Sequence, residues 1–196
     1  MASRSRRDHR RGASAAVLLA LCALAALAIG LATRRIGQRA SGLEYADLIA
    51  SQAGANGIDE SLLRAVIWCE SRYDPGAVSS VGARGLMQLT EETFEWVRWR
   101  LDEEDRTDFD DLFDPETNVR YGAYLLRWLL DAFEGEEATA LAAYHAGANI
   151  VRQWLADARY SSDGKTLDAI PYADTEKYVS AVLRAERGFR NRFGST

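Results

Sequence analysis

The chain of 196 residues contains only two cysteines, Cys22 and Cys69. Cys22 lies in a long apolar run and Cys69 on an expected helix, so no disulfide between them is expected. The folded part must therefore be stabilised by its hydrophobic core. Cys69 has no catalytic partner near it in sequence, and we interpret it as a small buried apolar side chain rather than a nucleophile.

Two further patterns are missing from the sequence. No stretch keeps the alternation of apolar and polar residues that is typical of strands, and no segment repeats. The acidic run from Asp102 to Asp111 lacks the spacing and turn glycine of a calcium-binding loop, so we interpret it as a solvated loop. The sequence therefore predicts an all-α domain with a cleft, without a metal site or a cofactor.

Positive charge is scarce outside the N-terminal region. Residues 1–40 carry eight arginines and one aspartate, a charge of +7, so the other 156 residues carry −12 against −5 for the whole chain. An acidic domain argues against nucleic acid as a partner.

The N-terminal region has the pattern of a membrane-directed segment. Residues 1–14 are basic, residues 15–33 contain an apolar run of 18 residues, and residues 34–42 form a polar linker. More arginines precede the run than follow it, which predicts a transmembrane signal-anchor with residues 1–14 in the cytoplasm. The rest of the chain would then face outward from the cell membrane as a single-pass protein. Ala26-Leu27-Ala28 offers a possible cleavage site, so a released form stays open.

Residues 43–193 contain apolar spacing typical of helices. Asp59, Thr90 and Asp114, the last followed by Pro115, are expected helix caps. The expected helices span residues 43–55, 59–70, 91–101, from 115 to a stop at Gly135, 136–146, 149–158 and 175–193. We expect Trp96 and Trp99 to pack in the core, with a sugar-stacking platform as the alternative.

Glu70 stands at the end of an apolar stripe. The stripe consists of Leu62, Leu63, Val66 and Ile67, which recur at helical spacing. A carboxylate on a core-facing stripe is partly desolvated, which raises its pKa and makes Glu70 a candidate general acid. The alternative is an ion pair with Arg64, Arg72 or Arg84. Asp74 and Asp174 are candidates for a second carboxylate, but their positions in the sequence do not direct either toward Glu70.

Four motifs occur in order along the chain. They are Glu70-Ser71, SSVGARGLMQL at residues 79–89, AYHAG at residues 143–147 and IPYADTEKYV at residues 170–179. Together they resemble the motifs of the soluble-type lytic transglycosylases, whose domain is similar to goose lysozyme and cleaves the glycan strands of peptidoglycan. The resemblance covers residues 43–193 and implies a lysozyme-like helical domain with a substrate cleft.

The resemblance also implies a mechanism with a single acid. In these enzymes one glutamate acts as acid and base, because the C6 hydroxyl of the substrate closes a 1,6-anhydro ring at the MurNAc-GlcNAc bond. Glu70 matches that residue. The positions that match substrate-binding or cleft-shaping residues of the family are Ser71, Ser79, Met87, Gln88, Tyr144, His145 and Tyr178.

Three positions depart from the family pattern. His145 stands where asparagine is usual, which replaces an amide by a group that titrates. Thr90 replaces a frequent methionine and Asp174 a usual glutamate. Two other functions stay open: a goose-type muramidase that uses water as acceptor, and a catalytically silent glycan-binding scaffold.

Overall fold

The computed structural model describes residues 43–101 and 106–193, and within them every regular element is helical. The elements in chain order are η1 (Leu43–Tyr45), α2 (Ala46–Asn56), α3 (Glu60–Ser71), α4 (Glu91–Leu101), η2 (Phe109–Phe113), α5 (Pro115–Ala132), α6 (Glu137–Ala146), α7 (Ala148–Leu155) and α8 (Ala173–Phe193). The prediction of an all-α domain is confirmed for this part of the chain.

The predicted segments 1–14, 15–33 and 34–42 lie outside the described residues. The signal-anchor and the linker therefore stay predictions. None of the helices in the described ranges combines the length and the apolar character needed to cross a membrane.

The three predicted helix caps are present. The Asp59 side chain accepts hydrogen bonds from the backbone N–H groups of Ser61 and Leu62 at the start of α3. Asp114 accepts one from Thr117 at the start of α5, and the Thr90 hydroxyl accepts one from Thr93, 3.3 Å away, in α4. These bonds satisfy backbone donors that have no partner inside the helix.

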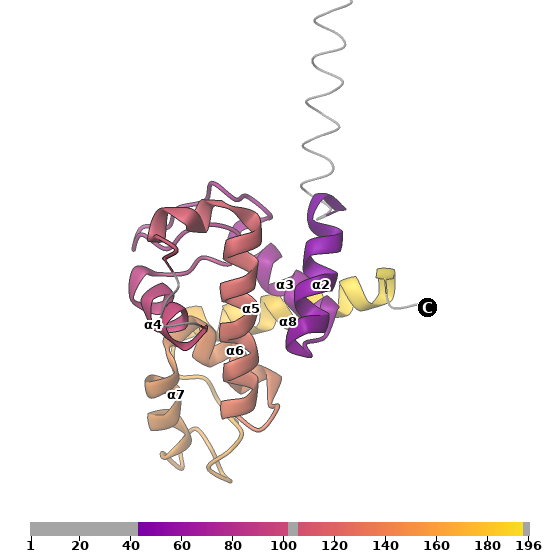
Figure 1. Ribbon diagram of the computed structural model, residues 1–196. Coiled ribbons are helices and arrows are strands. Elements are labelled where there is room, and N and C mark those ends of the chain that lie inside the picture. Colours follow the sequence, from indigo (N-terminus) through magenta and orange to yellow (C-terminus); the bar gives the residue numbers. More distant parts are fainter. Residues whose placement is uncertain (1–42, 102–105, 194–196) are drawn as a thin grey trace, which may run out of the picture. The chain divides into compact units, whose positions relative to one another are not determined.

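Helix α3 lies between α2 and α8, and α5 packs against α2, α4 and α6 (Figure 1). The stripe that contains Leu62, Leu63, Val66 and Ile67 is buried against these neighbours. A smaller apolar cluster joins α4 to α5 and η2 through Leu89, Phe94, Val97, Leu112 and Tyr121. The helix that carries Glu70 is thus buried over most of its length, from Ser61 to Ile67.

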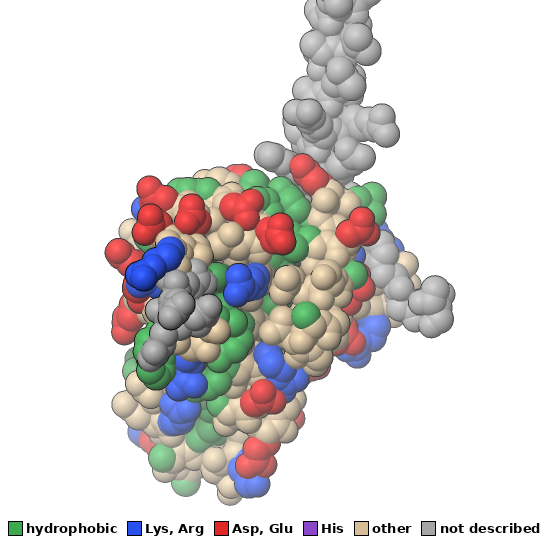
Figure 2. Space-filling model, in the orientation of Figure 1, with side chains coloured by type: hydrophobic (Ala, Val, Ile, Leu, Met, Phe, Trp, Pro, Cys, Tyr) green, Lys and Arg blue, Asp and Glu red, His purple; other side chains and the backbone are tan. Residues whose placement is uncertain are grey.

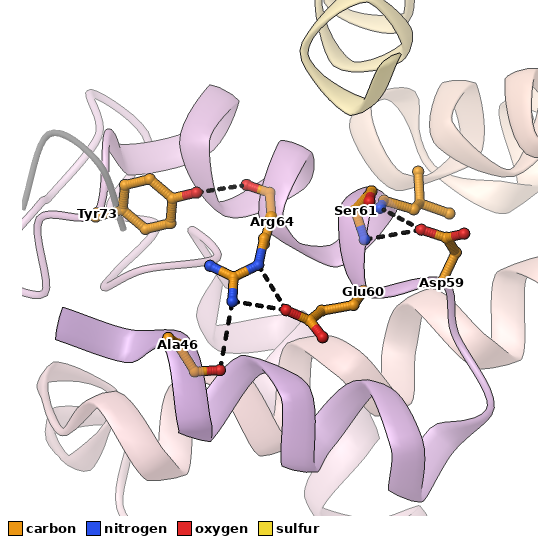
Figure 3. A network of polar contacts seen from close by, with 7 residues as sticks. Ala46, Asp59, Glu60, Ser61, Arg64 and Tyr73 are labelled. Carbon is orange, nitrogen blue, oxygen red and sulfur yellow. Dashed lines mark hydrogen bonds and ion pairs between the residues drawn. The ribbon is translucent and has the colours of Figure 1, made fainter. Parts of the chain in front are cut away.

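The start of α3 is fixed to α2 by a buried arginine (Figure 3). Arg64 pairs with Glu60 one turn earlier, with an N–O separation of 2.6 Å, and it donates to the Ala46 carbonyl oxygen. The Tyr73 hydroxyl donates to the backbone oxygen of Arg64, 3.2 Å away. A guanidinium needs such partners when it is buried, because its charge otherwise loses hydration without compensation.

The loop from α3 to α4 folds back on itself through isolated bridges at Val78, Arg84 and Leu89. Gly85 has a φ of +74°, and a Cβ there would lie 2.1 Å from Nδ2 of Asn118 and 2.2 Å from the oxygen of Leu112. Only glycine fits at this crossing. The loop therefore rests directly on the start of α5.

Two sequence expectations need correction. Trp99 is 62% exposed, and Trp96 is half-buried and packs edge-on against Trp128, so the core does not enclose this pair of tryptophans as expected. The end of the acidic run forms η2 rather than a loop. Leu112 of η2 is buried, which supplies the apolar contact that the acidic composition concealed.

Candidate active site

Glu70 lies on the last turn of α3 and lines a cavity of about 270 Å³. The residues lining it are Glu70, Ser79, Val81, Ala83, Gln88, Leu89, Thr90, Thr93, Leu125, Tyr144 and His145. Among these described residues, Glu70 is the sole carboxylic acid. The cavity combines an acid with hydroxyl, amide and imidazole groups, as a site for a polar ligand requires.

Burial raises the pKa of Glu70 from its ordinary value of 4.5 to about 7. The Tyr178 phenol opposes this rise by stabilising the charged form, although the two groups do not reach standard hydrogen-bond geometry. A carboxyl group with this pKa can both donate and accept a proton near neutral pH.

The three arginines that the sequence offered as ion-pair partners of Glu70 interact with other side chains. Arg64 pairs with Glu60, and Arg84 pairs with Asp110. The Arg72 guanidinium lies over the Trp68 ring, 4.1 Å from its centre. The ion-pair interpretation of Glu70 is therefore not supported for the described residues.

Asn118 of α5 holds the loop that lines the cavity. Its Oδ1 accepts a hydrogen bond from the Met87 N–H at 2.7 Å, and its Nδ2 donates to the backbone oxygens of Arg84 and Leu112, each 2.9 Å away. The side chain is fully buried and all three bonds cross between segments. A buried amide with complete pairing fixes the loop in one position.

Ser71 ties the same loop to α3, because its hydroxyl bonds the Leu86 oxygen at 2.8 Å. Met87 is completely buried, and its side chain packs where Gly122 leaves space on α5. Neither residue lines the cavity. The Ser71 hydroxyl and the Met87 side chain therefore anchor the loop without lining the cavity.

Ser79 and Gln88 lie on the cavity wall with some of their polar groups engaged by the loop. The Ser79 hydroxyl oxygen accepts from the backbone N–H groups of Val81 and Ala83. The Gln88 amide nitrogen donates to the oxygens of Ala77 and Gly85. These bonds leave the Ser79 hydroxyl hydrogen and the Gln88 amide oxygen to face a ligand.

Tyr178, on α8, lies outside the cavity lining, with a buried hydroxyl. Its ring contacts His145 with centroids 4.7 Å apart, and His145 Nδ1 lies 3.0 Å from the hydroxyl of buried Thr175. Burial lowers the pKa of His145, and nearby Asp174 partly offsets that effect. The imidazole thus links α6 to α8 beside the acid.

The structure brings five of the eight predicted site residues to one cavity: Glu70, Ser79, Gln88, Tyr144 and His145. Ser71, Met87 and Tyr178 lie behind it. Sequence reasoning missed Asn118 as the residue that positions the loop. The sequence feature that could have indicated Asn118 is its position on the central helix, where a polar residue stands next to apolar Val119 and one turn before Gly122.

The other candidates for chemistry lie apart from this arrangement. Asp74 is exposed and its carboxylate accepts from the Gly76 N–H in a turn, and Asp174 is exposed on α8. Burial raises the pKa of the Cys69 thiol, which disfavours a thiolate nucleophile. The described residues contain no group of side chains arranged to hold a metal ion.

A helical fold with one half-buried acid beside a polar cavity is consistent with the class of lysozyme-like domains. The family model described as "Transglycosylase SLT domain" matches residues 47–167. The chain belongs to this family, so the resemblance read from the four motifs is confirmed.

Curated relatives agree with this assignment. The chain is 31% identical over 153 residues to the soluble lytic murein transglycosylase of Salmonella typhimurium, a match covering 78% of this chain and 24% of that protein. It is 32% identical over 148 residues to membrane-bound lytic murein transglycosylase F of Ectopseudomonas mendocina, covering 73% and 28%. The chain therefore spans about a quarter of the length of these relatives.

Solved structures show the same fold. The crystal structure of an inactive Glu-to-Gln mutant of the lytic transglycosylase Slt from Pseudomonas aeruginosa superposes with a TM-score of 0.66 at 30% sequence identity. The match covers 76% of this chain and 24% of that chain. The prediction of a lysozyme-like domain is thereby confirmed.

Proposed function

We propose that this chain is a peptidoglycan lytic transglycosylase in which Glu70 acts as the single catalytic acid and base. The observation that carries the proposal is a half-buried carboxyl group, with a pKa of about 7, in a polar cavity whose described lining contains no second carboxylic acid. Hydrolysis with two carboxylates needs a partner that this cavity does not offer. Membership of the SLT family and the names of the relatives support the same activity.

The reaction needs Glu70 to give up one proton and then to take up another. Neutral Glu70 donates its proton to the oxygen of the MurNAc-GlcNAc bond, and the bond to the anomeric carbon breaks. The N-acetyl carbonyl assists at that carbon, and the C6 hydroxyl of the same sugar then attacks it. The Glu70 carboxylate accepts the hydroxyl proton, which forms 1,6-anhydro-MurNAc and restores the acid.

The cavity residues bind the sugar in this proposal. The Ser79 hydroxyl donates to the substrate, and the Gln88 amide oxygen accepts from it, since their other polar groups are engaged by the loop. Tyr144 and His145 face the substrate from α6. Ser71 and Met87 hold the loop in position, and Tyr178 stabilises the charged form of Glu70.

In this proposal the N-terminal segment determines on which side of the membrane the domain lies. Residues 15–33 anchor the chain in the cell membrane, with residues 43–193 outside the cytoplasm where the peptidoglycan lies. The basic residues 1–14 and the name of one relative as membrane-bound support the anchor. Cleavage of the segment would give a released form with the same activity.

Digestion of purified peptidoglycan by the full chain tests the function, with product masses as the readout. Anhydro-muramyl ends, lighter by one water than reducing ends, are expected. Reducing ends would instead support the goose-type muramidase, and the absence of products from a folded protein would favour a glycan-binding scaffold.

The variant Glu70→Gln tests the assignment of the acid. We expect it to lose more than about a thousandfold in rate while keeping the helical circular dichroism of the wild type. Glu116→Gln, an exposed glutamate in the first turn of α5, is the matched control and should cleave normally. Substantial activity in the Glu70→Gln protein would refute the proposed mechanism.

A further inference from the structure

A second cavity, of about 500 Å³, adjoins the cavity that holds Glu70. The two share the lining residues Thr93, Leu125 and Tyr144. The second cavity is bounded by α4, by α5 and by the segment where α6 passes into α7. A polymer that reacts at Glu70 therefore has a continuous surface along which a branch can enter the second cavity.

Two arginines converge on one tryptophan in this cavity. Trp96 and Trp128 pack edge to face with centroids 4.7 Å apart. The Arg100 guanidinium of α4 lies 4.5 Å from the Trp96 ring centre and 5.7 Å from that of Trp128. The Arg152 guanidinium of α7 lies 5.9 Å from the Trp128 ring centre.

Neither guanidinium has a carboxylate partner in the described part of the chain. Arg152 donates to the Asn149 amide oxygen at 3.1 Å, and Glu92, which also lines the cavity, forms no ion pair with Arg100 or Arg152. Within residues 43–101 and 106–193, six other arginines pair with acids: Arg64, Arg84, Arg98, Arg127, Arg159 and Arg190. Arg100 and Arg152 are instead oriented by aromatic faces, which leaves N–H donors available to a planar anion.

Arg100 and Arg152 are basic residues in a domain whose net charge is negative. Residues 41–196 carry −12, and acidic side chains gather at the top of Figure 2, over η2 and the start of α5. Basic and hydrophobic side chains lie together over α4 and α7 in the same view (Figure 2). An anion is repelled by the acidic face and attracted to the cavity between these helices.

We propose that the second cavity binds an ionised carboxylate of the peptide stem carried by the glycan strand, with Arg100 and Arg152 as its ligands. The inference rests on the proposed function. MurNAc, the sugar that reacts at Glu70, carries its stem through a lactyl ether, so the stem branches from a sugar bound in the cavity that adjoins the second one. In strands with stems the lactyl group is joined to the stem as an amide and the sugars are neutral, whereas free carboxylates of the stem match two guanidiniums held over an indole.

The test compares two substrates: peptidoglycan strands with their stems, and the same strands stripped of stems by an amidase and then converted to amides at the lactyl carboxylates that the amidase exposes. The full chain is assayed as wild type and as Arg100→Gln, Arg152→Gln and the double variant. Arg120→Gln is the matched control, because that exposed arginine also lies over an aromatic ring, 5.9 Å from the Tyr121 centre, and lines neither cavity.

The double variant is expected to lose about tenfold in kcat/KM on strands with stems and to match the wild type on stripped strands. Arg120→Gln should match the wild type on both. An equal loss on both substrates, or no loss on strands with stems, would overturn the inference.

A binding measurement separates this inference from the proposed function. If the wild type cleaves neither substrate, the proposed function fails, and equilibrium binding of stem-bearing fragments to Glu70→Gln protein then decides the inference. Weaker binding after the double arginine substitution supports it, and unchanged binding overturns it. Binding to anionic phospholipid vesicles that depends on these arginines, with unchanged binding of the fragments, would assign the cavity to a lipid headgroup instead.

Discussion

The Tyr144 hydroxyl donates a hydrogen bond to the backbone oxygen of Met87, with 2.8 Å between the two oxygens. The bond ties α6 to the loop that carries Gln88. Burial and the negative charge of Glu70 raise the pKa of Tyr144 well above its ordinary value, so the phenol stays neutral. Because its proton is directed at Met87, we interpret Tyr144 as a residue that positions the loop and orients the site.

Replacing Tyr144 by phenylalanine should therefore destabilise the protein and lower its rate of glycan cleavage. The Met87 oxygen would lose its partner, at a cost of about 1–3 kcal/mol in the free energy of unfolding. Urea denaturation measures this cost, and Tyr172→Phe serves as the control because Tyr172 is 55% exposed. Equal stability of the two variants would contradict the role given to the bond.

The rate of cleavage should fall as pH rises above about 7. The acid must be protonated to act, and burial holds the pKa of Glu70 at about 7, so each further pH unit removes about 90% of the active form. A profile of kcat/KM between pH 4 and pH 9 measures the effect. A rate that stays level to pH 9 would exclude Glu70 in this environment as the acid.

The free energy of unfolding of the wild type should also decrease as pH rises. In the Glu70→Gln protein, the part of this decrease that comes from Glu70 should be absent. Between the ordinary value of 4.5 and the folded pKa of about 7, the unfolded chain releases the Glu70 proton while the folded protein retains it. Unfolding therefore becomes easier as pH rises through this window.

The expected size of the difference follows from about 1.4 kcal/mol per pH unit, which gives about 3 kcal/mol across the window. Denaturation at pH 4 and pH 8 measures it. Glu70→Gln should gain stability relative to the wild type by about this amount between the two pH values. A constant difference would mean that the carboxyl group is not buried as described.

Gly122→Ala should destabilise the protein, since a Cβ there would lie 2.3 Å from the Met87 sulfur in a completely buried contact. Overpacking of this kind costs about 1–3 kcal/mol. Gly188→Ala on α8 is the matched control, because a Cβ at that position meets nothing within 4 Å. That variant should gain about 0.5–1 kcal/mol from helix propensity. Melting curves of both proteins decide the comparison, and a gain in both would show that Met87 can move aside.

The local patterns of the sequence determined much of this protein. The caps Asp59, Thr90 and Asp114 and the buried stripe leading to Glu70 were predictable, because they depend on residues within one or two turns of each other. The motifs also indicated the family. They placed Ser79, Gln88, Tyr144 and His145 in one site before any geometry was available.

Only the tertiary structure decided which groups meet. Met87 lies 31 residues from Asn118 and 57 from Tyr144, so no periodicity relates them. The same holds for Arg100 and Arg152, which reach one indole from different helices. Helical spacing specifies which face of a helix is buried, but the packing of whole helices sets what that face touches, and the pKa of Glu70 depends on that packing.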